Sequence, residues 1–222
     1  MSTTKTASKP TASRKEMLVN EPYHVMECIL FGSIANESVT DLENRLAGLC
    51  DPGCIEFHEH EMVFSLRTQS DADVTTLRLR RKFNVDPYSS AQWRVRYMGR
   101  PEPDANCPVL VRKVIDSVCY SPNIMEFVKT LGLRLDYEYI GKGKAYTAGL
   151  VKILVYNIQK TDKPGTYEPT YLKKLNENST AVEISMTIPD GAEYNSAARQ
   201  LRSFSDQFFP LIEMQKVEYT NK

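Results

Sequence analysis

The stretches EMVFSLR (61–67), TTLRLRRKF (75–83) and QWRVRYMG (92–99) decide the fold, because apolar and polar residues alternate along each of them. A period of two places successive side chains on opposite faces of a β-strand. Residues 61–99 therefore predict three consecutive antiparallel strands.

A row of basic residues follows from the same alternation. Arg78, Arg80, Arg94 and Arg96 occupy every other position of their stretches, which places four guanidiniums on one face of the sheet. Lys152, in a later predicted strand, is a candidate for the same face. Inside a barrel the row would suit anionic phosphate, because the planar guanidinium binds oxygen atoms in pairs. On the outside it would be an ordinary solvated face, which the general exposure of charged residues favours without deciding the matter.

The rest of the chain predicts further strands and three helices. Runs rich in β-branched and aromatic residues, and helical repeats of apolar residues, define them. The strands are expected at 23–34, 110–120, 179–188 and 211–219, with a hairpin over 134–158 that turns around Gly141 and Gly143 and a surface loop at 161–170.

The three predicted helices have recognisable starts, stops and apolar stripes. Ser38 and Asp41 form a capping box, Ser121 and Pro122 open the second helix before Gly132 ends it, and Pro210 ends the third. Their core-facing stripes are expected to be Val39, Leu42, Leu46 and Leu49; Ile124, Phe127, Val128 and Leu131; and Tyr194, Ala197, Ala198, Leu201, Phe204 and Phe208.

These elements indicate an α+β, mainly β fold. About eight alternating strands in one domain must protect their edges, and closing the sheet removes the edges altogether. We therefore expect an antiparallel closed barrel with flanking helices over residues 21–222. Residues 1–20 are Ser, Thr, Lys and Ala-rich, which predicts a disordered tail.

Composition narrows the classes of function. The 222 residues carry 28 basic and 28 acidic side chains, so net charge gives no attraction to nucleic acid or to anionic lipid. No apolar run approaches the roughly 18 residues that span a bilayer, and the first twenty residues lack a signal-peptide core. Five cysteines, an odd number, suit a reducing compartment such as the cytosol or nucleus.

Two short patterns suggest metal chemistry. Cys50, Cys54, His58 and His60 have the atoms that zinc prefers, but their spacing matches no strong zinc signature, so ordinary cysteines and a polar strand edge are favoured. Glu59 and Glu61, two residues apart on one face of a strand, form a carboxylate pair that could hold a divalent metal for phosphate chemistry.

Alternating arginines beside paired carboxylates resemble the triphosphate tunnel enzymes. That family places a lysine after its carboxylate pair, whereas Met62 and Val63 follow Glu61 here, and the strands around Glu27 and Glu183 each carry a lone carboxylate. The resemblance implies a similar barrel shape. It assigns no catalytic residue, metal ligand or cofactor, and a tunnel-type, metal-dependent triphosphate hydrolase is kept as the alternative function.

Longer strings resemble another family, that of subunit 18 of the Mediator complex. The likeness spans about residues 24–219 and rests on several extended segments in the same order. These are ENRLAGLCD (43–51), HEMVF (60–64), VRYMGRPE (95–102), LVRKVIDSVCYSPNIMEFVKTLGLRLDYEYIGKG (110–143) and GLVKILVYNI (149–158).

This resemblance implies a non-enzymatic, nuclear subunit of the Mediator head module, a coactivator for RNA polymerase II. Members of the family pair with Mediator subunit 20 and are tethered by a helix of Mediator subunit 8, and they contact other head-module subunits and the RNA polymerase II machinery. A protein-docking barrel of this kind is expected to need no cofactor, no membrane and no sequence-specific nucleic acid.

Overall fold

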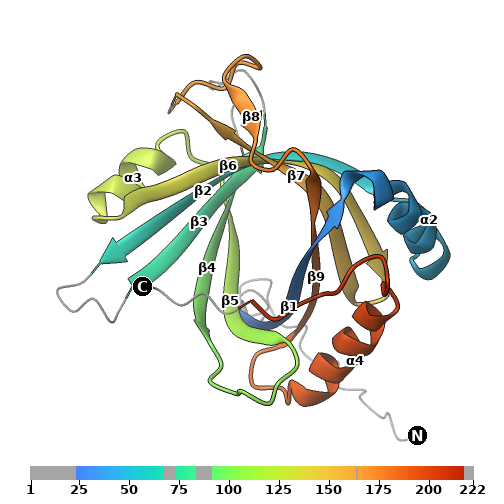
Figure 1. Cartoon of the computed structure of the whole chain (residues 1–222). Coiled ribbons are helices and arrows are strands. Elements are labelled where there is room, and N and C mark those ends of the chain that lie inside the picture. Colours follow the sequence, from blue (N-terminus) through green and yellow to red (C-terminus); the bar gives the residue numbers. More distant parts are fainter. Residues whose placement is uncertain (1–23, 68–73, 84–91, 164, 218–222) are drawn as a thin grey trace, which may run out of the picture.

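The computed structural model of the protein describes residues 24–67, 74–83, 92–163 and 165–217. Eight antiparallel strands close into a barrel in the order β6-β2-β3-β4-β5-β1-β9-β7, with β7 pairing back to β6 (Figure 1). A short strand, β8, is added at the end of β7. The closed, mainly β barrel with flanking helices that the sequence predicts is thus confirmed.

The bounds of the elements are as follows. The strands are β1 (His24–Ala35), β2 (Ile55–Arg67), β3 (Val74–Lys82), β4 (Trp93–Pro101), β5 (Leu110–Cys119), β6 (Arg134–Ala148), β7 (Val151–Thr161), β8 (Leu172–Lys174) and β9 (Ser179–Pro189). The helices are the short η1 (Asn36–Ser38), α2 (Val39–Leu49), α3 (Ile124–Thr130) and α4 (Asn195–Asp206).

The barrel has a charged inner face and an apolar outer face. Register pairs Glu61 with Arg80, and Arg80 with Arg94, so these side chains share the inner face. Neighbouring positions such as Leu79 and Trp93 point outward and are buried there. Strand alternation therefore places the main apolar cores outside the barrel, between its wall and the helices.

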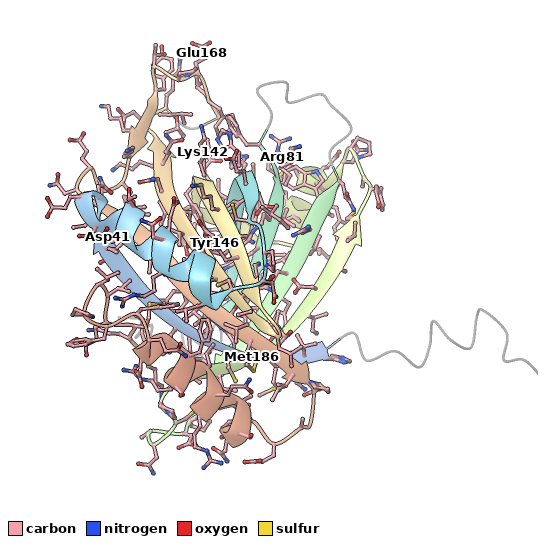
Figure 2. All side chains as sticks on the ribbon, turned by 90° about the vertical axis from the view of Figure 1, so that its right-hand side faces the viewer. Asp41, Arg81, Lys142, Tyr146, Glu168 and Met186 are labelled. Carbon is pink, nitrogen blue, oxygen red and sulfur yellow. The ribbon has the colours of Figure 1, made fainter. Side chains whose placement is uncertain are left out.

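The larger core lies between one side of the barrel and helices α2 and α4, which cover the same side of the molecule (Figures 1 and 2). Outward residues of β1, β7 and β9 pack there against both helices and the segment that follows α4. Fully buried members include Leu30, Ile153, Ile184, Leu42, Leu46, Leu201, Phe208 and Met214. The predicted stripes of α2 and α4 are confirmed in their central residues.

A smaller core lies under α3 on another side of the barrel. It consists of outward residues of β2, β3 and β4 together with the inner face of α3: Phe64, Leu79, Trp93, Ile124, Val128 and Leu133. The prediction for this helix is wrong in part, because Phe127 and Leu131 are 58% and 51% exposed. A helix of seven residues has one buried face, and Ile124 and Val128 already fill it.

The predicted position of the hairpin turn is also wrong. β6 runs without interruption through Gly141 and Gly143, and the turn lies at Gly149, whose φ of +59° suits a glycine. The two earlier glycines instead face inward where β6 meets β7. A Cβ built on Gly143 would lie 2.1 Å from the carbonyl oxygen of Val155, so this position needs a glycine for close approach of two strands.

Smaller differences concern the ends of elements. Ser38 occupies the cap of α2 but makes no side-chain cap bond, and α3 begins only after Asn123, whose N–H donates to the hydroxyl oxygen of Ser121. In place of the strand predicted at 211–219, the described part, up to residue 217, forms a single bridge between Phe31 and Gln215. The tail predicted at 1–20 lies outside the described residues. No helix in the described ranges is both long and apolar enough to cross a membrane.

Replacing Gly143 with alanine should destabilise the barrel by about 2 kcal/mol or more, because the added methyl group meets backbone atoms that cannot move aside. Gly141→Ala is the matched control, since its Cβ would sit at an ordinary 3.5 Å from Tyr156. Chemical denaturation of both variants measures the difference. Equal stability of the two variants would contradict the close-approach explanation.

Candidate functional site

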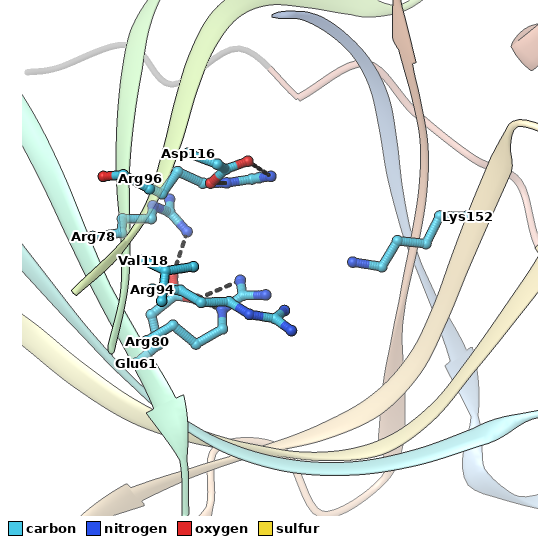
Figure 3. A pocket seen from close by; sticks show the side chains of 9 residues that line it. Glu61, Arg78, Arg80, Arg94, Arg96, Asp116, Val118 and Lys152 are labelled. Atoms are coloured by element: carbon cyan, nitrogen blue, oxygen red, sulfur yellow. Dashed lines mark hydrogen bonds and ion pairs between the residues drawn. The ribbon is translucent and has the colours of Figure 1, made fainter. Parts of the chain in front are cut away.

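The barrel lumen contains a cavity of about 270 Å³ with a strongly charged lining. Side chains from β2, β3, β4, β5 and β7 converge on it (Figure 3). The charged residues that line it are Glu61, Arg78, Arg80, Arg94, Arg96, Asp116 and Lys152. The four arginines predicted to share a face therefore do so inside the barrel, and Lys152 joins them. The alternative prediction, that these arginines form a solvated face on the outside of the barrel, is wrong.

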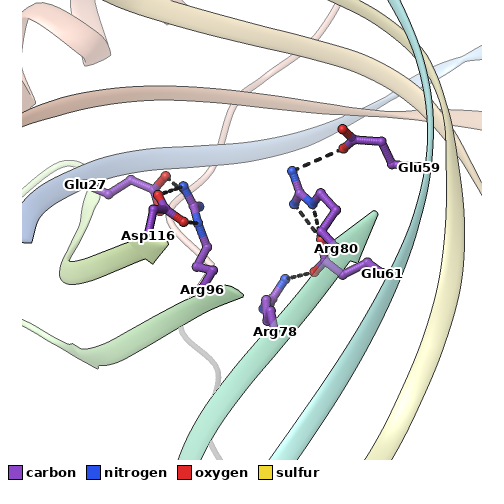
Figure 4. Close-up of polar contacts among 7 residues, drawn as sticks. All are labelled: Glu27, Glu59, Glu61, Arg78, Arg80, Arg96 and Asp116. Carbon is purple, nitrogen blue, oxygen red and sulfur yellow. Dashed lines mark hydrogen bonds and ion pairs between the residues drawn. The ribbon is translucent and has the colours of Figure 1, made fainter. Parts of the chain in front are cut away.

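Glu61 forms the centre of one ion-pair group (Figure 4). Arg78 Nη1 donates to Glu61 Oε1 at 2.8 Å, and Arg80 Nε donates to Oε2 at 2.7 Å. A second carboxylate, Glu59, lies 3.5 Å from Arg80. Burial disfavours ionisation of Glu61, which is 2% exposed, but Arg80 and Arg78 outweigh it and lower its pKa. Glu61 is therefore an ionised carboxylate fully engaged by two guanidiniums.

Arg96 forms the centre of a second group. Its Nε and Nη2 donate to the two carboxylate oxygens of Asp116, both at 2.9 Å, and its Nη1 donates to Glu27 Oε1 at 3.1 Å. This paired geometry is the strongest form of an arginine–carboxylate contact. It links β4 to β5 and β1, three neighbouring strands (Figure 4). Sequence alternation predicts Arg96 on this face but gives no sign that Asp116 and Glu27 are its partners.

Arg94 and Lys152 differ from the other three cations. Within the described ranges, neither makes an ion pair or a side-chain hydrogen bond, and both side chains are open to solvent. Lys152 extends from β7 toward the arginines of the opposite wall (Figure 3). The surrounding protein, and then the charge of Arg80, lower the pKa of Lys152. These two cations are the part of the cavity that is free to meet a ligand.

The carboxylates considered for metal-dependent chemistry lie in the lumen, but three of them are engaged by arginines. Glu59, Glu61 and Glu27 are each held by an arginine, and burial, followed by the charge of Glu27, raises the pKa of Glu183. Among the described residues, no three His, Cys, Asp or Glu side chains form a group that could hold a metal ion. The arginine partners therefore occupy the positions where a cation would need free carboxylate oxygens.

The four residues considered for zinc are also separated by the fold. His58 and His60 point outward from β2, where His60 is buried with Nε2 2.9 Å from Glu138 Oε2 and packs against Tyr167. Tyr167 donates its hydroxyl to the same carboxylate at 2.8 Å, which fastens the loop before β8 to the barrel. Cys50 ends α2 and Cys54 is exposed. The sequence spacing gives no sign of Glu138 and Tyr167.

Comparison with known proteins gives consistent matches along the whole domain. The family model described as Med18 protein matches residues 26–221. A Caenorhabditis elegans protein, Mediator of RNA polymerase II transcription subunit 18, is 47% identical over 212 residues, covering 95% of this chain and 91% of that protein. The Drosophila melanogaster protein of the same name is 35% identical and covers 87% of each chain.

Solved structures show the same fold at low sequence identity. A chain in the structure of the Schizosaccharomyces pombe Mediator head module superposes with a TM-score of 0.70 at 17% identity, covering 86% of this chain and 98% of that one.

Replacing Glu61 with glutamine should destabilise the protein by about 3 kcal/mol, because two partly buried guanidiniums lose their shared carboxylate. Since the folded pKa of Glu61 lies below its usual value, its stabilisation is present above the ordinary glutamate range and is lost as pH falls through the folded pKa. Denaturation at neutral and acidic pH should therefore show a gap between wild type and variant that narrows in acid. Glu56→Gln, exposed on the same strand, is the control. A constant gap would contradict the assignment.

Proposed function

Because the chain belongs to the Med18 protein family, we propose that it acts as subunit 18 of the Mediator head module in the nucleus. In this role it is a non-enzymatic, protein-docking barrel and a coactivator component for RNA polymerase II. The observation that carries the proposal is 47% identity to a Mediator subunit 18 along 95% of the chain. We further propose that it pairs with Mediator subunit 20 and is tethered by a helix of Mediator subunit 8.

The surface around α3 supports a docking role. Phe127 lies on the outer face of α3, Leu131 follows one turn later as the residue that caps the helix, and Leu135 lies at the start of β6. They are 58%, 51% and 48% exposed. We call these three residues the α3 patch. Large exposed apolar side chains on neighbouring elements are the kind of surface that protein interfaces cover.

The contacts inside the lumen also support a docking subunit rather than a triphosphate hydrolase. A metal-dependent triphosphate hydrolase needs carboxylate oxygens that are free to coordinate cations. Here Glu61 is committed to Arg78 and Arg80, and Arg96 engages Glu27 and Asp116. These pairs link β2 to β3 and β4 to β5 and β1, so in this lumen the charged groups join strands to one another.

Charged substitutions in the α3 patch should weaken assembly with the other head-module subunits. Phe127→Asp and Leu131→Asp are each expected to reduce capture of subunits 20 and 8 at least about tenfold, because an interface core excludes unpaired charge. Leu150→Asp, at the β6–β7 turn, is the matched control, since Leu150 is 72% exposed and lies on another element. Pull-down of the tagged full chain from nuclear extract, with quantitative mass spectrometry, measures the capture.

The wild-type chain must recover Mediator subunits in that experiment for the proposed function to stand. If it does, and both α3 variants recover them equally well, the function stands and the α3 patch is not the interface. Circular dichroism of each variant confirms that the barrel is folded.

A further inference from the structure

We infer that the lumen binds a small multivalent oxyanion between Arg94 and Lys152. This goes beyond the proposed docking function, which needs only the outer surface. The inference rests on three observations. The lumen contains a cavity, two cations that line it have no partner among the described residues, and the other cations that line it are paired with carboxylates.

The lining of the cavity carries five cations against the two carboxylates Glu61 and Asp116, and Glu27 and Glu59 pair with its arginines from beside it. Arg78 and Arg80 share Glu61, and Arg96 holds Asp116 and Glu27. After these pairings, Arg94 on β4 and Lys152 on β7 remain as cations that line the same cavity from opposite walls (Figure 3). An anion with charged groups at both ends is the kind of ligand that would use both cations, whereas a monovalent anion would satisfy only one.

The electrostatics of Lys152 agree with this geometry. The protein atoms around the amine, which displace part of its water, contribute most to lowering the pKa of Lys152; Arg80 contributes next, and Arg96 acts in the same direction. Glu183 and Glu59 act in the opposite direction and do not outweigh them. An anion beside the amine would favour its charged form and raise its pKa, so binding should be accompanied by proton uptake where the free amine is partly deprotonated.

The size and chemistry of the cavity limit the ligand class. A volume of about 270 Å³ lies just below the usual range of ligand sites, which suits a compact anion. The guanidinium of Arg94 binds two oxygens of one oxyanion with matching geometry, and the ammonium of Lys152 supplies a point charge. Phosphoryl and carboxylate groups both offer such oxygens, so the anion is expected to resemble diphosphate or citrate.

The test is isothermal titration of the full chain with diphosphate, citrate and acetate at low ionic strength. Diphosphate or citrate should bind with an affinity that falls with added salt, and acetate should bind at least about tenfold more weakly. Stronger binding of diphosphate identifies a phosphoryl source, and stronger binding of citrate identifies a carboxylate source. Absence of binding by both multivalent anions, or acetate binding as tightly, would overturn the inference.

Variants locate the site within the molecule. Combining Arg94→Gln with Lys152→Gln should reduce affinity at least about tenfold without loss of fold, because neither side chain has a partner among the described residues. Lys129→Gln, on the exposed face of α3, removes one charge outside the lumen and should bind as wild type does. Unchanged affinity in the double variant would place binding elsewhere and refute the site. Titration at alkaline pH in buffers of different ionisation enthalpy should show proton uptake in the wild type that is lost in Lys152→Gln.

Discussion

The ion pairs inside the lumen are the constraint on which the rest of this structure depends. Closing a pleated sheet sends alternate side chains inward, and here the inward set is charged. Charges withdrawn from water are tolerable only when partners compensate them. Glu61 between Arg78 and Arg80 meets this condition across β2 and β3, and Arg96 with Asp116 and Glu27 meets it across β4, β5 and β1. The same contacts hold neighbouring strands in register.

A charged interior has a direct consequence for the exterior. Most of the large apolar residues of the strands face outward, so the wall has to be covered by other elements. Helices α2 and α4 cover one side, whereas α3 covers another only with its inner face and leaves Phe127 and Leu131 toward solvent. A barrel built in this way leaves apolar side chains on its outer surface that a partner protein could cover. That property agrees with the proposed role as a subunit of a large assembly.

Much of this architecture follows from sequence alone, and the exceptions have physical causes. Alternation predicts the strands and places the four arginines on one face of the sheet. Which face lines the lumen is decided only when the sheet closes into a barrel, and the sequence of a single strand does not show this. Gly141 and Gly143 indicate a turn by residue type, although their cause is the close passage of β7. Helical periodicity assigns Phe127 to the core. The pattern does not show that α3 has only seven residues and buries a single narrow face, formed by Ile124 and Val128. Partners such as Asp116 and Tyr167 depend on long-range register and loop position, which local patterns do not carry.

The segment after α4 completes the larger core, and this has a bearing on synthesis in the cell. Phe208, Ile212 and Met214 pack against the outer wall, and Gln215 bridges to Phe31 near the opposite end of the described chain. A ribosome releases these residues after every barrel strand has already emerged. Until then the outer wall lacks part of its cover, and the nascent chain presents the kind of surface that chaperones recognise. The cover of the outer wall is therefore completed by a few apolar residues that follow every barrel strand in the chain.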